Sequence, residues 1–191
     1  PMGHKLAIDF GTTNSVIVRW DAESEDAKII AAEGLSQEAI GDLPPLVPSL
    51  LYVNDGSSGK VVCGHAVREQ QLDTMKDNRL FRNFKRGIVA TPAPEPRNID
   101  NAEWADRDAG RTFIRTLIDA IPYSNDDIDQ LVLTAPVASF EGYLAWLNGV
   151  IDEVAMDKIR VVDESTAAAL GYAVTKPGAV VLVFDFGGGT L

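Results

Sequence analysis

The sequence has little of several features that define particular classes of protein. Its 191 residues include one cysteine, Cys63, which excludes an internal disulfide and a cysteine-cluster metal site. Lys and Arg number 17 against 28 Asp and Glu, and no basic stripe is present, so we expect no nucleic-acid partner. No apolar run approaches the roughly 20 residues that cross a bilayer. No secretory leader precedes the first predicted strand. We therefore expect a cytoplasmic protein with no membrane partner.

The excess of acidic residues does not exclude phosphate-bearing ligands. A net charge of −11 disfavours nucleic acid, but backbone N–H groups and a metal ion can still bind phosphates. The length suffices for one sizeable core with a smaller appended subdomain. Composition alone thus permits a nucleotide-binding protein.

Apolar periodicity and turn residues predict an alternation of strands and helices. Strands are expected at 5–10, 15–20, 27–32, 50–53, 60–64, 131–135, 159–162 and 180–186. Helices are expected at 105–120, 139–155 and 164–174, with Asp163 or Ser165 near the cap of the last. We expect residues 33–47 to form a crossover loop, 65–86 to be mainly helical, and the proline-bearing segment 90–103 to be a surface loop.

These elements predict an α/β protein in two parts. Residues 1–32 and 105–191 would form a core with a mixed, five-stranded sheet and helices on its faces. Residues 33–104 would form a small α/β subdomain inserted into that core. Pro1 precedes the Met and is interpreted as a cloning remnant.

Two similar turns, one near each end of the sequence, are the strongest chemical signal. Each follows an apolar strand and places a carboxylate, glycines and a hydroxyl in that order. They read Asp9-Phe10-Gly11-Thr12-Thr13-Asn14 and Asp185-Phe186-Gly187-Gly188-Gly189-Thr190. Glycine lets backbone N–H groups approach phosphate oxygens closely. The two Asp side chains would instead act on Mg²⁺, directly or through water. Together the turns predict a clamp for a triphosphate.

Two further residues are weaker candidates from the sequence alone. Glu164 begins a helix that is rich in small residues, next to the end of a predicted strand, where α/β sites lie. A carboxylate at a helix N-terminus is, however, also favoured by the helix dipole alone. Composition and spacing do not single out Lys85, because most lysines are solvated surface groups.

The motifs in their order resemble the DnaK-type (70-kilodalton heat-shock) chaperone family. The resemblance rests on Ile8 through Ser15, Pro48 through Tyr52, Gly64 through Val67, Phe84-Lys85-Arg86, Leu133 through Pro136, Glu164 through Leu170 and Asp185 through Thr190. It implies the N-terminal part of an actin-like (ribonuclease H-like) ATPase domain that binds ATP or ADP with Mg²⁺. The implied partners are unfolded polypeptide clients, J-domain cochaperones and nucleotide exchange factors.

The same resemblance implies a role for each matching residue. Lys85 and Glu164 would orient the attacking water and the γ-phosphate, and Asp9 and Asp185 would organise Mg²⁺ through water. The remaining residues of the two turns would contact phosphates: Gly11, Thr12, Thr13, Asn14, Gly187, Gly188, Gly189 and Thr190.

Two departures from the family pattern qualify these expectations. Ser165 stands where the family usually has Pro. After Pro136 the sequence lacks the family's Asn-Asp-Ala-Gln-Arg run, and no Arg follows until Arg160. The coupling of ATP to client release would then be lost or made differently.

Three other functions remain open at this stage. An actin-superfamily filament protein and a sugar-kinase-like phosphotransferase share single motifs with the sequence, and a regulatory pseudo-ATPase would bind ATP without hydrolysing it. The family's second lobe and substrate-binding domain have no counterpart in these residues. An isolated chain of this length is thus expected to hold nucleotide weakly and to be inactive as an ATPase.

Overall fold

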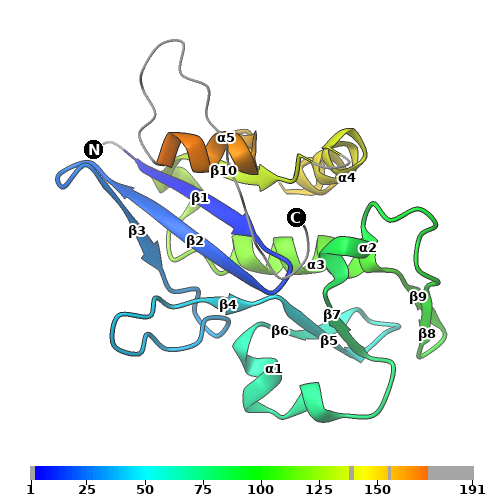
Figure 1. Ribbon diagram of the computed structural model, residues 1–191. Coiled ribbons are helices and arrows are strands. Elements are labelled where there is room, and N and C mark those ends of the chain that lie inside the picture. The colour runs from blue at the N-terminus through cyan, green and yellow to red at the C-terminus, as the bar shows by residue number, and fades with distance from the viewer. Residues whose placement is uncertain (1–2, 138–139, 155, 172–191) are drawn as a thin grey trace.

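The computed structural model describes residues 3–137, 140–154 and 156–171. Over these residues the protein is a mixed α/β structure, with a large mixed sheet, helices packed against it, a small sheet and a separate hairpin (Figure 1). The predicted strand 180–186 and the glycine-rich turn after it lie outside the described residues.

The main sheet contains most of the predicted strands. Its strands follow the order β11-β10-β1-β2-β3, and the two-residue strand β4 pairs with β2. Their bounds are β1 His4–Phe10, β2 Asn14–Asp21, β3 Asp26–Ile30, β4 Val47–Pro48, β10 Ile128–Ala135 and β11 Ile159–Asp163. The described residues thus form six strands in this sheet, not the five expected, because β4 is supplied by a segment predicted to be a loop.

Strand direction in this sheet determines where the strand ends meet. β10 runs parallel to β1 and to β11, and β1 runs antiparallel to β2. Alternate residues such as Leu6, Ile8 and Leu133 are buried, as expected for a sheet face that packs on helices. The carboxyl ends of β1, β10 and β11 therefore lie along one edge.

Two amphipathic helices, which contact each other, supply the other side of the core. They are α3 (Asp106–Asp119) and α4 (Phe140–Glu153). The predicted periodicity of α3 is confirmed, since Phe113, Ile114, Leu117 and Ile118 are all buried. The Asp108 carboxylate accepts a hydrogen bond from the Ala105 backbone N–H at 2.9 Å and secures the start of α3.

The segment between β3 and α3 builds the small sheet, a hairpin and several short helices (Figure 1). The sheet has the order β6-β5-β7 and the hairpin is β8-β9. The bounds are β5 Leu50–Asp55, β6 Lys60–Cys63, α1 His65–Glu69, η1 Leu72–Thr74, β7 Leu80–Arg82, α2 Phe84–Gly87, β8 Arg97–Ile99 and β9 Ala102–Trp104. Outside this segment, η2 spans Asn125–Asp127 and α5 spans Glu164–Gly171.

Two predictions about the inserted segment were wrong in part. Residues 65–86 are not mainly helical, because left-handed backbone at Gln71 (φ 56°) and Asn83 (φ 56°) interrupts the helices and β7 pairs with β5. Residues 90–103 are not only a loop, since they include β8 and β9. The turn between these strands uses Asp100 (φ 53°) and Asn101 (φ 65°), two residue types that tolerate positive φ.

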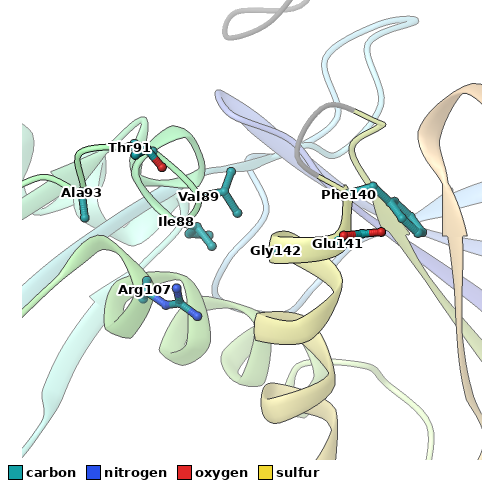
Figure 2. Close-up of a pocket in the computed structure, with 9 residues that line it drawn as sticks. Ile88, Val89, Thr91, Ala93, Arg107, Phe140, Glu141 and Gly142 are labelled. Carbon is teal, nitrogen blue, oxygen red and sulfur yellow. The ribbon is translucent and has the colours of Figure 1, made fainter.

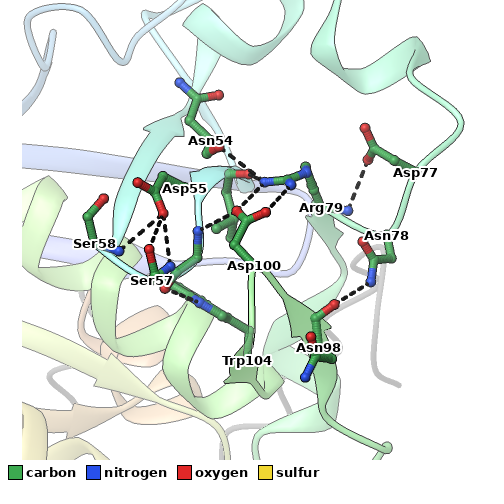
Figure 3. Close-up of polar contacts among 12 residues, drawn as sticks. Asn54, Asp55, Ser57, Ser58, Asp77, Asn78, Arg79, Asn98, Asp100 and Trp104 are labelled. Atoms are coloured by element: carbon green, nitrogen blue, oxygen red, sulfur yellow. Dashed lines mark hydrogen bonds and ion pairs between the residues drawn. The ribbon is translucent and has the colours of Figure 1, made fainter.

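A polar network ties the β8-β9 turn to the β5-β6 hairpin (Figure 3). Arg79 donates to both carboxylate oxygens of Asp100, at 2.8 and 2.5 Å, and the Gly56 N–H donates to Asp100 at 2.9 Å. These bonds, led by that from Arg79, lower the pKa of the Asp100 carboxyl. Trp104 Nε1 donates to the Gly56 carbonyl at 3.1 Å. Because these polar groups find their hydrogen-bond partners within the network, we interpret it as support for the fold.

A cluster of aromatic rings joins β1, α2 and α3. Phe10 of β1 lies 5.8 Å from Phe84 of α2 and 5.7 Å from Phe113 of α3, centroid to centroid, and Phe84 lies 5.6 Å from Phe113. All three side chains are buried. Such contacts add to the free energy gained by burial. The cluster fixes α2 against the end of β1.

Cys63 behaves as a small apolar residue of the core. Its side chain is buried beside Thr116, and burial raises the pKa of its thiol from 9.0 to about 12. Thiolate is the reactive form. A folded-state pKa above the unfolded value stabilises the protein below about pH 9. That contribution is lost as the pH rises towards about 12.

We predict that Cys63 in the folded protein resists labelling by Ellman's reagent at pH 8. The shift from 9.0 to about 12 leaves about a thousandfold less thiolate than in the unfolded chain. The measurement compares labelling rates with and without denaturant. Comparable rates in the two conditions would show that Cys63 is accessible in the folded state.

Candidate functional site

The candidate site lies where β1, β10 and β11 end together. Asp9 is the penultimate residue of β1, and Asp163 ends β11. Ile8 pairs with Leu133, which pairs with Val161, so the three strands end nearly level. The register thereby brings Asp9 and the start of α5 to the same edge.

Asp163 positions the start of α5. Its carboxylate accepts hydrogen bonds from the Thr166 N–H at 2.8 Å, the Thr166 hydroxyl at 2.6 Å and the Ser165 hydroxyl at 2.8 Å. These bonds, led by that from the Thr166 hydroxyl, lower the pKa of Asp163. Of the two residues that the sequence left open as the cap, Asp163 and Ser165, the structure has Asp163 accepting these bonds. The next residue, Glu164, is thereby held at the strand edge.

Lys85 reaches this edge from α2. Its Nζ donates to Glu164 Oε1 at 2.6 Å and to the Phe10 backbone carbonyl. The Lys85 side chain is 10% exposed and that of Glu164 26%. The ammonium also lies 5.4 Å from the centroid of the Phe10 ring and 5.8 Å from that of Tyr143. A carboxylate, a carbonyl and two ring faces therefore surround the cation.

Asp9 contributes a carboxylate on the solvent side of the site. It is exposed, and the Thr134 hydroxyl of β10 donates to its Oδ1 at 2.7 Å. Sequence reasoning did not identify Thr134 as a partner of Asp9. The link depends on parallel pairing across 125 positions, which no local pattern predicts.

The first glycine-rich turn joins β1 to β2, as predicted. The Ser49 hydroxyl donates to the Gly11 carbonyl at 2.7 Å and lies 3.0 Å from the Ser15 hydroxyl. The Ser49 N–H donates to the Thr13 carbonyl at 2.9 Å. Ser15 and Ser49 are both buried. Ser49, which lies between β4 and β5, therefore holds the turn, another contact that sequence reasoning missed.

Gly11 has a structural reason to be glycine besides any approach to phosphate. A Cβ on Gly11 would lie 2.1 Å from the Asn14 backbone oxygen. The three nearest atoms all belong to the Asn14 backbone, so no flexible side-chain end is there to move away. Thr12, Thr13 and Asn14 complete the turn as partly or fully exposed residues.

The structure thus describes some of the predicted site residues and not others. Lys85 and Glu164 are in contact, and Asp9 lies at the same strand edge with Gly11, Thr12, Thr13 and Asn14 following it. The predicted residues of the second turn, Asp185, Gly187, Gly188, Gly189 and Thr190, lie outside the described residues. Their roles, and those of the first group, stay predictions.

Two wider properties of the described residues bear on the site. In the part of the chain that the structure describes, no three His, Cys, Asp or Glu side chains gather as a set of metal ligands. Nor does any helix there have the length and apolar character to cross a membrane. Magnesium binding through Asp9 and Asp185 remains a prediction.

A separate hollow of about 520 Å³ lies between the segment after α2 and the start of α4 (Figure 2). Ile88, Val89, Arg107, Phe140 and Gly142 are among the residues that line it. Among the described residues, none of the predicted site residues lines this hollow, and its described lining holds no cluster of reactive side chains. The candidate site is therefore taken to be the strand edge.

Comparisons with known proteins agree with the motifs. The model of the family described as Hsp70 protein matches residues 122–191. Curated relatives named "Chaperone protein DnaK" include one from Thermosipho melanesiensis, 28% identical over 188 residues, and one from Thermotoga neapolitana, 27% identical. Each alignment covers 97% of this chain and 29% of the relative. The chain therefore spans 29% of the length of these relatives.

The Asp163 cap gives a prediction with a defined pH dependence. Asp163→Ala should lower the free energy of unfolding by about 1 kcal/mol at pH 7. Because the folded-state pKa is lowered, the carboxylate stabilises above the unfolded pKa and this stabilisation is lost as pH falls through the folded pKa. Chemical denaturation of both proteins should show the difference shrinking below about pH 4.

Asp163→Asn is the matched control, because an amide oxygen can also cap a helix. Its stability should lie closer to that of the unaltered protein at pH 7. Equal stability of Asp163→Ala and the unaltered protein at pH 7 would contradict the role of Asp163 as a cap.

The close contact at Gly11 gives a second prediction. Gly11→Ala should lower the free energy of unfolding by about 2 kcal/mol without any ligand, because the added Cβ displaces backbone. Gly149→Ala is the control, since its Cβ meets no atom within 4 Å and it lies inside α4. Thermal unfolding should show the control unchanged or stabilised. An unaltered unfolding temperature in Gly11→Ala would mean that the turn tolerates a side chain.

Proposed function

We propose that this chain, which is related to the Hsp70 family, forms the phosphate-facing part of an ATP-hydrolysing site in a DnaK-type chaperone. The observation that carries the proposal is the Lys85–Glu164 contact of 2.6 Å at the edge where Asp9 also lies. Lys85 and Glu164 are 79 positions apart. Their pairing at a strand edge suits a site that positions phosphate and water.

The proposed chemistry is mainly one of position and charge. Phosphoryl transfer to water needs the nucleophile held in line and the phosphate charge stabilised. The Lys85 ammonium, held by Glu164 and the Phe10 carbonyl, would stabilise the γ-phosphate. The Glu164 carboxylate would orient the attacking water. The N–H groups of the Gly11–Asn14 turn would contact phosphate oxygens.

The residues present fit a hydrated Mg²⁺ better than a directly bound one. Among the described residues no three carboxylates gather as ligands, but the Asp9 carboxylate is exposed beside the turn. Mg²⁺ keeps several waters in most protein sites and neutralises phosphate charge. Asp9 would hold that hydration shell, and we propose Asp185 as its counterpart.

The names of the relatives favour a chaperone over the other candidates. A filament protein or a sugar kinase could share the strand–turn motif, but the curated relatives that align with 97% of the chain are called DnaK chaperones. We therefore propose that the full-length protein uses ATP to bind and release unfolded polypeptides in the cytoplasm. J-domain cochaperones and nucleotide exchange factors would be its partners.

The proposal also extends to the domain arrangement. We propose an actin-like ATPase lobe in which residues 1–32 and 105–191 form the core and 33–104 an inserted subdomain. β4 (Val47–Pro48) pairs with β2 in the main sheet, so a short part of the proposed inserted subdomain belongs to the core sheet.

Replacing Lys85 tests the proposed chemistry. In the full-length protein, Lys85→Ala should lower the rate of ATP hydrolysis by about 100-fold or more, as expected for a positioned charge. Nucleotide affinity should fall much less, because the ammonium acts mainly on the transferring phosphate. Steady-state turnover and equilibrium binding of Mg-ATP separate the two effects.

Lys60→Ala is the matched control, since Lys60 is exposed on β6. It should retain normal turnover. Normal turnover in Lys85→Ala would refute the assignment and make Arg86 the next residue to replace.

A further inference from the structure

Tyr143 is a buried side chain that the proposed chemistry does not yet use. It lies in the first turn of α4 and is fully buried, with 0% relative exposure. Its ring packs on Trp146 at 5.2 Å between centroids, and the Lys85 ammonium lies 5.8 Å from its centroid. The ring of Tyr143 therefore forms part of the wall around Lys85.

The hydroxyl of Tyr143 has no hydrogen-bond partner among the described residues. Unpartnered buried hydroxyls are rare in folded proteins, because they lose their hydrogen bonds to water without replacement. Trp146, its neighbour in α4, does have a partner, since its Nε1 donates to the Arg107 carbonyl at 3.3 Å. Among the described residues, the Tyr143 hydroxyl thus lacks a hydrogen-bond partner, whereas the indole N–H of Trp146 beside it has one.

The charges around Tyr143 determine what kind of partner suits it. Burial, then the charges of Glu164 and Asp9, raise the pKa of the phenol, so it stays protonated and is available as a donor. Carboxylates accept hydrogen bonds and cannot donate when ionised. A buried water usually makes about three hydrogen bonds to polar groups that lack partners. Such a water could accept from the phenol and donate to a carboxylate.

We propose that Tyr143 is a positioning residue of this site: its ring supports the Lys85 ammonium, and its hydroxyl holds a buried water against the carboxylates of Glu164 and Asp9. The inference rests on the proposed ATPase function for its kinetic consequence and on the fold alone for the water. It gives α4, from which sequence reasoning drew no site residue, a direct part in orienting the reacting groups.

The first test is independent of nucleotide. A high-resolution crystal structure of this chain should contain a water within hydrogen-bond distance of the Tyr143 hydroxyl and of Glu164 or Asp9. In the Tyr143→Phe crystal that water should be absent while Lys85 keeps its bond to Glu164. A tyrosine hydroxyl without any water in the first crystal would overturn the proposal.

The second test is kinetic and uses the full-length protein. Tyr143→Phe should lower kcat for ATP hydrolysis about tenfold, the scale of one lost hydrogen bond, with KM changed less than about twofold. Tyr143→Leu also loses the ring and should fall further, towards the level of Lys85→Ala. Tyr123→Phe is the matched control, because Tyr123 bonds Arg19 and stacks on His4.

The outcomes separate the two proposals. If the unaltered protein hydrolyses ATP and Tyr143→Phe has the same kcat, Tyr143 is not a positioning residue. If kcat and KM change together and Tyr123→Phe loses as much, the effect is on general stability and the proposal also fails. If the unaltered protein does not hydrolyse ATP, the proposed function is refuted, and the crystals alone decide whether Tyr143 holds a water.

Discussion

The packing of Phe10 against Phe84 and Phe113 is the contact on which the rest of the site depends. The Phe10 ring packs in the core, and its backbone carbonyl at the strand edge accepts a hydrogen bond from Lys85. Because Phe84 directly precedes Lys85, burial of its ring fixes the backbone that carries the ammonium. Three buried rings each contribute free energy on the scale of about 1.5–3 kcal/mol. Apolar packing of the Phe84 ring thus fixes where the Lys85 ammonium lies.

The parallel register of β1, β10 and β11 supplies the second constraint. Parallel strands place their carboxyl ends together, and helices that follow them begin at the same edge. In this protein that geometry lines up Asp9, Thr134 and Asp163, and the Asp163 cap then determines where Glu164 lies. The candidate site therefore combines Lys85 of α2 with residues that the main sheet brings to its edge.

The electrostatics of the site differ from those of the protein as a whole. The chain carries a net charge of −11, which on average repels phosphate. At the strand edge, however, a cation that is 10% exposed lies between a carboxylate and a carbonyl. Charges in such partly buried positions interact more strongly than those in water, since solvent screens them less. In the proposed function, the Lys85 ammonium and a hydrated Mg²⁺ would together offset the repulsion between phosphate and this acidic protein. The rings of Phe10 and Tyr143 flank the ammonium.

The amino-acid sequence by itself determined the features that depend on neighbours along the chain. Strands β1, β2, β10 and β11, the helices α3 and α4, the turn after Phe10 and a cap at Asp163 or Ser165 follow from periodicity and turn chemistry, which act over a few residues. Tertiary structure decided the features that depend on distant pairs. β7 is a strand because β5 pairs with it, and Lys85 differs from other lysines only because folding brings it to Phe10 and Glu164, 75 and 79 positions away. Tyr143 fits the ordinary apolar face of a helix in the sequence. Only the packed core places its ring beside the Lys85 ammonium and leaves its hydroxyl without a partner among the described residues. Local propensity acts within one element, whereas burial and charge are set by all the elements that meet at a point.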